Sequence, residues 1–168
     1  MSLRAALVDD LKTVTAVTDI VSDRISDMFY EFEDFLNSSA NSVSKFPAVS
    51  IVNDSNEYEP NLDGHDSFRF ASYTIVCYQV VNQSKMKSRS VNVRNKERDK
   101  LRIVDTLAET IADYLADKRD IITNVGGEQY KLRQPHIESI ADDVAESADN
   151  REVVTREITY TILYSKEN

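Results

Sequence analysis

Two stretches of alternating side chains decide the fold of this chain: SFRFASYTIVCYQV at Ser67–Val80 and EVVTREITYTILY at Glu152–Tyr164. In each stretch apolar residues alternate with polar ones, so one side of the strand faces a core and the other faces water or a neighbour. In the second stretch Ile158, Tyr160 and Ile162 fall on one parity. Both stretches therefore predict long strands of a half-buried sheet.

Helical periodicity appears in two other regions. Near the N-terminus an apolar stripe predicts an amphipathic helix; its members are Leu3, Leu7, Leu11 and Val14. A second stripe predicts a long helix over residues 96–119, with Asn95 as its N-cap. The apolar positions of that helix are Leu101, Val104, Ala108, Ile111 and Leu115.

The segment from residue 19 to residue 36 has two interpretations. Apolar residues recur there at helical spacing, at Ile25, Met28, Phe29, Phe32 and Phe35. The run 13–18 is rich in β-branched residues, which favours an end to the first helix before this segment. The alternative is a short extended piece that begins at Arg24–Ile25.

Two further strands and several turns complete the pattern. Strands are predicted over 46–53 and over 130–144, the latter interrupted by Pro135. Polar stretches predict loops, at about 37–45, 53–66 and 82–95, and turns at Gly126–Gly127 and at 145–150. The element order predicts one α+β domain spanning residues 1–168. It is an antiparallel β-sheet with an N-terminal helix and one long helix (about 96–119) packed on one face.

The net charge of −9 is unevenly distributed along the 168 residues. Residues 1–84 carry 5 basic and 13 acidic side chains (−8), residues 85–102 carry 8 and 2 (+6), and residues 103–168 carry 7 and 14 (−7). An acidic chain with one basic segment argues against general nucleic-acid binding.

The basic segment opposes the dipole of the helix that it precedes, so local helix stability does not explain it. One interpretation is a solvated loop. The other is a contact with an acidic surface of an adjacent subunit, or with a nucleic acid that passes nearby. The candidate interface residues are Lys85, Lys87, Arg89 and Arg94.

The sequence offers no recognisable catalytic or cofactor-binding set, so no catalytic residue, cofactor or metal site is predicted. His65 and His136 lack metal-pair spacing, and the lone Cys77 is expected to be a buried hydrophobe. Gly126–Gly127 alone cannot cradle a phosphate and is expected to end a helix. The acidic clusters are expected to be solvated; they are Glu31, Glu33, Asp34, Asp142 and Asp143. No membrane-spanning run or signal peptide is found, which predicts synthesis in the cytoplasm without a membrane partner.

The order of elements resembles the tail-completion or tail-terminator proteins of long-tailed bacteriophages. The resemblance is a pattern over most of the chain and contains no signature motif. It runs from the helix at 3–7 through Asp23-Arg24-Ile25 to Phe46-Pro47-Ala48-Val49-Ser50-Ile51. It continues through the strand Phe68–Tyr78 and the helix around Ile103–Leu107, and closes on Ile158-Thr159-Tyr160-Thr161-Ile162. The chain departs from that pattern in its long polar stretches at 31–45 and 82–95.

This resemblance implies a structural virion protein without enzyme activity. Such a subunit forms a ring, commonly a homohexamer, at the head-proximal end of the tail, where it ends tube growth and joins tail to head. The implied partners are further copies of the chain, the tail-tube protein, neck or connector proteins, and genome DNA that passes without specific binding. The alternatives are another neck protein (head-completion or connector adaptor), and, from other classes, a small enzyme or a monomeric binding module.

Overall fold

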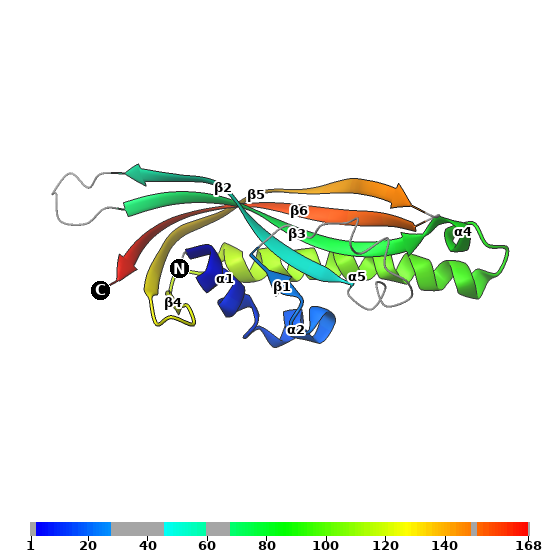
Figure 1. Cartoon of the computed structure of the whole chain (residues 1–168), viewed down its shortest axis with the longest axis horizontal. Coiled ribbons are helices and arrows are strands. Elements are labelled where there is room, and N and C mark those ends of the chain that lie inside the picture. The colour runs from blue at the N-terminus through cyan, green and yellow to red at the C-terminus, as the bar shows by residue number, and fades with distance from the viewer. Residues whose placement is uncertain (1–2, 28–45, 60–67, 149–150, 168) are drawn as a thin grey trace.

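The computed structural model describes residues 3–27, 46–59, 68–148 and 151–167. These residues form a curled six-stranded sheet in the order β1-β2-β3-β6-β5-β4, with helices packed against it (Figure 1). Neighbouring strands are antiparallel except for β1, which pairs parallel with β2. The predicted α+β fold is confirmed. The strands are β1 (Ile25–Ser26), β2 (Ala48–Glu59), β3 (Phe68–Asn82), β4 (Ile121–Thr123), β5 (Gln129–Ala148) and β6 (Arg151–Glu167).

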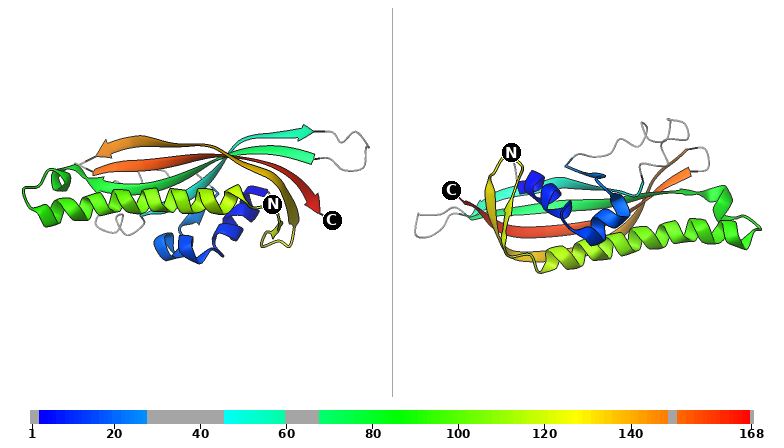
Figure 2. Two further views of the ribbon diagram at one scale, coloured as in Figure 1. Left: turned by 180° about the vertical axis from the view of Figure 1, so that it is seen from behind. Right: turned by 90° about the horizontal axis from the view of Figure 1, so that it is seen from below.

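Most of the helices gather on one face of the sheet, and the short helix α4 (Gln83–Met86) lies beyond the end of β3. The longest of them, α5, runs lengthwise beneath β3, β5 and β6, and the N-terminal helices lie beside it (Figure 2). They are α1 (Leu3–Leu11), α2 (Thr15–Val21), α4 (Gln83–Met86) and α5 (Val91–Ala116). No described helix is long and apolar enough to cross a membrane.

The two stretches that decide the fold pair with each other along the centre of the sheet. Residues from Arg69 to Asn82 on β3 pair with residues from Tyr164 to Arg151 on β6, without a register shift. Ile75 lies opposite Ile158 and Tyr73 opposite Tyr160, all four on the face that α5 covers. Because a one-residue slip would turn every side chain to the other face, this apolar pattern fixes the register.

The main core lies between this face and the helices. From α5 it receives Val104, Leu107, Ala108, Ile111, Ala112 and Leu115, all buried. Their spacing of three and four residues is that of one helix face. The stripe Leu3, Leu7 and Leu11 of α1 is buried in the same cluster, as predicted.

The opposite face of the sheet buries a smaller apolar cluster towards one end. Cross-strand pairing brings its members together, since Ala48 lies opposite Tyr78 and Val80 opposite Val153. The cluster consists of Phe46, Ala48, Val76, Tyr78, Val80 and Val153. The sheet is therefore buried on both sides there, which simple alternation along the strands did not predict.

A polar cluster fixes α1 to the end of α5. The Tyr114 hydroxyl donates to Asp10 (Oη–Oδ2 2.8 Å), and the Lys118 ammonium donates to the Tyr114 hydroxyl (2.7 Å). Lys118 also forms ion pairs with Asp10 (3.4 Å) and Asp120 (3.3 Å). Burial opposes the charge of Lys118, but these partners outweigh it and raise its pKa. The chain leaves the helix before Lys118, so the predicted end at residue 119 is wrong by three residues.

The predicted start of the long helix is also wrong. The helix begins at Val91 with Ser90 as its N-cap, so Asn95 lies inside it. The predicted loop 82–95 instead contains α4 and the first turn of α5. Asn82 caps α4, because its side chain accepts a hydrogen bond from the Lys85 backbone N–H (3.0 Å). Residues 82–95 lack an apolar stripe. The Asn82 cap and a buried polar contact, described below, stabilise this stretch instead.

Near the N-terminus the first helix ends before the β-branched run 13–18, as predicted, but the run itself starts a second helix. α1 ends at Leu11, and Thr15–Val21 forms the separate helix α2. Of the two interpretations of 19–36, the extended one holds at Ile25. This residue belongs to β1 and pairs with Val49 of β2. The other positions of that proposed helical stripe, and the predicted loop 37–45, lie outside the described residues.

The strands extend further than the sequence pattern indicates. β2 continues to Glu59, so residues 53–59 are not a loop; backbone pairing with β3 carries this polar stretch past a register shift at Asn53/Ser55. β5 reaches Ala148 and replaces most of the predicted turn at 145–150. Its ladder is shifted between Arg133 and His136, where Pro135 lies, so the predicted interruption is confirmed. The short β4 was not predicted.

Truncating the α5 stripe should destabilise the whole fold. Ile111→Ala removes a fully buried side chain and should lower the free energy of unfolding by about 2–5 kcal/mol. Ile103→Ala is the matched control on the same helix, where the side chain is 41% exposed; its expected effect is within about 0.5 kcal/mol. Urea unfolding of both variants measures this difference. Equal effects would contradict the packing of α5 described above.

Candidate assembly surfaces

The predicted interface residues gather at the corner between α4 and α5, at one end of the molecule (Figure 1). Lys85, Lys87 and Arg89 are exposed there. Arg94 differs, because it is half-buried and its Nη1 donates to the Ser88 carbonyl oxygen (2.9 Å). Three of the four cations are thus exposed. The fourth, Arg94, stabilises the loop between α4 and α5 on which they lie. We call residues 83–90 the basic corner.

A buried carboxylate, Glu97, anchors this corner to the sheet. It is 2% exposed and accepts hydrogen bonds from the Asn82 backbone N–H (2.9 Å) and from Lys100 Nζ (2.9 Å). Burial alone would raise the pKa of Glu97, but these two donors outweigh burial, so its pKa lies below the ordinary value. Glu97 was not predicted as a functional residue, although it lies four residues before Leu101 and extends the same helical stripe.

A second contact ties the corner to β6. Gln83 Nε2 donates to the Glu152 carboxylate, which lies at the start of that strand. Because Glu97 and Gln83 both hold the start of α4 against the sheet, the exposed cations that follow are presented on a supported surface.

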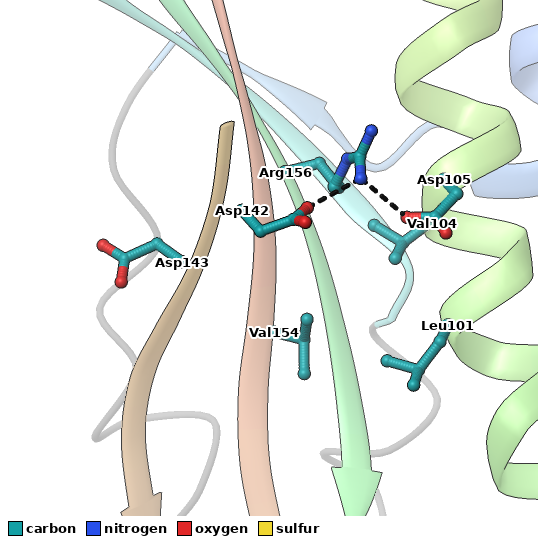
Figure 3. Close-up of a pocket in the computed structure, with 7 residues that line it drawn as sticks. All are labelled: Leu101, Val104, Asp105, Asp142, Asp143, Val154 and Arg156. Carbon is teal, nitrogen blue, oxygen red and sulfur yellow. Dashed lines mark ion pairs between the residues drawn. The ribbon is translucent and has the colours of Figure 1, made fainter. Parts of the chain in front are cut away.

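An open pocket of about 470 Å³ lies further along α5, between that helix, β5 and β6 (Figure 3). Arg156 of β6 lies between Asp142 of β5 and Asp105 of α5 and pairs with both (2.7 and 3.3 Å). Leu101, Val104 and Val154 supply apolar lining, and Asp143 lies at the rim, on the other side of β5 from Asp142. A signal for this site exists in the sequence: Arg156 interrupts the apolar parity of β6.

The pocket combines one shared cation with two carboxylates. Asp142 and Asp105 keep 69% and 50% of their side chains exposed, whereas Arg156 keeps 20%. The Nε atom of Arg156 is buried and has no hydrogen-bond partner among the described residues. The exposed carboxylates therefore favour an incoming cation.

The other residues considered for chemistry lie apart from one another where the structure describes them. Cys77 is buried in the main core, and burial raises the pKa of its thiol to about 12, with a small opposing effect from Arg156. His136 is exposed on β5 opposite Thr161, and His65 lies outside the described residues. Gly126–Gly127 forms the turn between β4 and β5, so the expected helix-ending role is wrong. Within the described ranges, no group of three or more His, Cys, Asp or Glu is placed to hold a metal ion.

The chain is similar to a known protein in its fold but not in its sequence. No protein-family model matches the sequence, and no curated protein does. Among solved structures, the chain is similar to one from the virion of a native gene transfer agent (GTA) particle, with a TM-score of 0.58 and 10% sequence identity. The similarity covers 98% of this chain and 95% of that chain. It therefore extends over the entire fold and is a likeness of fold.

The free energy of unfolding should depend on pH because Glu97 ionises in the folded protein. Its folded-state pKa lies below the unfolded value, about 4.3 for glutamate, so its contribution is complete above that value and is lost as the pH falls through the folded-state pKa. Glu97→Gln should cost about 1–3 kcal/mol at neutral pH, and its deficit should shrink below about pH 4. Urea unfolding across this pH range measures the difference.

Asp99→Asn is the matched control, because Asp99 pairs with Arg102 in an exposed position and should contribute at most about 0.5 kcal/mol. A deficit of Glu97→Gln that stays constant at all pH values would show that the carboxylate charge does not anchor the corner.

Proposed function

We propose that this chain is a structural subunit of a phage-like virion. The observation that carries the proposal is the similarity to a chain of the GTA virion, which spans nearly the whole of both chains. A match of this extent includes the curled sheet, the long helix and the N-terminal helices together. The proposed role is non-enzymatic: the subunit would act by binding copies of itself and other virion proteins.

Within such a particle, the role that fits best is a ring at the head-proximal end of the tail. The ring, commonly of six copies, would end growth of the tail tube and join the tail to the head. Its partners would be the tail-tube protein and the neck or connector proteins. The element order that resembles tail-terminator proteins supports this role, and the net charge of −9 suits a channel through which DNA passes without binding.

The surfaces described above give this proposal a physical basis. The basic corner and the Arg156 pocket are different patches of one chain: the corner precedes the start of α5, and the pocket borders the middle of that helix. Contacts between unlike patches are heterologous, and such contacts generate closed rings when the rotation between copies closes. A subunit that carries both patches is therefore suited to ring formation without any added chemistry.

Assembly of particles without this chain tests the proposed role. If the chain ends tube growth, its absence should give tail tubes longer than those of the complete particle, measured by electron microscopy, and adding the purified protein should restore the length. Tubes of normal length that fail to join heads would instead identify a head-completion or connector protein. Complete, functional particles in its absence would contradict both roles.

A further inference from the structure

The Arg156 pocket has the chemistry to receive a long cationic side chain. Its two carboxylates exceed its one guanidinium, and Asp142 stays 69% exposed although it is paired with Arg156. A bound anion would face both carboxylates, which disfavours it. A lysine or arginine would place its ammonium or guanidinium group against Asp142 and Asp105.

The apolar lining fits the rest of such a side chain. Leu101 and Val104 of α5 and Val154 of β6 border the same space as the carboxylates. Lysine and arginine cover apolar surface with their methylene stems while the charged head stays with its partner. The pocket thus matches a lysine or arginine side chain better than an isolated ion.

The chain itself carries a segment of that chemistry. Residues 85–102 have a net charge of +6, while the regions on either side carry −8 and −7. Lys87 and Arg89 are exposed in the basic corner, and within the described part of the chain neither forms an ion pair. Their charges are therefore available to a neighbour, and the acidic pocket complements them.

We propose that the pocket formed by Asp105, Asp142 and Arg156 in one copy binds the basic corner of a second copy through Lys87 and Arg89. This inference rests on the proposed ring and names the contact that would build it. Because donor and acceptor patches differ, each copy gives its corner to one neighbour and receives the corner of another. Charge complementarity sets the direction of the contact around the ring.

A charge-swap experiment tests the contact. Asp142→Lys alone, and Lys87→Glu with Arg89→Glu alone, should each raise the dissociation constant for self-association about tenfold or more, since attraction becomes repulsion. All three changes in one chain should restore association to near the wild-type level. A 1:1 mixture of the two reversed chains should also associate, because alternating copies restore every contact. Light scattering with negative-stain imaging measures mass and shape.

Control variants separate this contact from general effects of charge and folding. Asp113→Lys makes the same charge change as Asp142→Lys at an exposed position of α5, and Arg119→Glu reverses one exposed cation just beyond that helix; both should leave association unchanged. Asp142→Asn removes the charge with less strain and should weaken association to a smaller degree. Circular dichroism and thermal unfolding confirm that each variant is folded.

The possible outcomes distinguish the contact from the proposed function. Wild-type rings that tolerate both reversals, or reversals that the combined variant fails to rescue, would overturn this contact and leave the ring in place. Association that obeys the charge swap but forms no ring would support the contact and contradict the ring. A wild-type chain that stays monomeric at every soluble concentration would overturn the contact. The proposed function would then be tested separately, by the tail-assembly experiment.

Discussion

The unshifted pairing of β3 with β6 constrains every other part of this structure. Fourteen consecutive residue pairs join these strands, from Arg69 with Tyr164 to Asn82 with Arg151. One set of side chains faces the helices and forms the main core, and the other set faces the opposite side. Since a slip by one residue would exchange these sets, the ladder determines where α5 can pack and which residues it covers.

The surfaces proposed for assembly follow from this ladder. Asn82 ends the paired part of β3 and donates its backbone N–H to Glu97, which holds the basic corner. Arg156 lies opposite Cys77 on the helix-covered face of β6, where it reaches Asp105 of α5 and Asp142 of β5. Both patches therefore occupy fixed positions relative to the same two strands. A subunit that must meet identical neighbours around a ring benefits from such rigidity, because preorganised surfaces lose less entropy on binding.

The sequence predicted the parts of the fold that apolar periodicity determines. The two central strands, the α1 stripe and the middle of α5 bury most of the residues expected of them; the exceptions on the helices are Val14, which lies outside α1, and Leu101, and both are half-buried. Periodicity failed where polar contacts or backbone pairing stabilise the structure instead. The first turns of α5 depend on Glu97 and Arg94, and the polar end of β2 is held by its ladder with β3.

The candidate surfaces were only partly visible in the sequence. The excess of positive charge at 85–102 located the basic corner, but it did not show that Arg94 is occupied by the Ser88 carbonyl oxygen. The pocket joins residues from three elements that lie up to about fifty positions apart, so charge patterning along the chain cannot find it. One charged residue on the apolar parity of β6 was its only local sign.

Amide hydrogen exchange of the isolated chain tests whether the β3–β6 ladder is the rigid frame on which these surfaces are built. Amides at the centre of β3 and β6, together with those of α5 that contact them, should exchange last and at a common rate set by global unfolding. Amides of α4 and β4 should exchange earlier through local opening. If β6 exchanged before α5, or β3 and β6 exchanged at separate rates, the frame described here would be wrong.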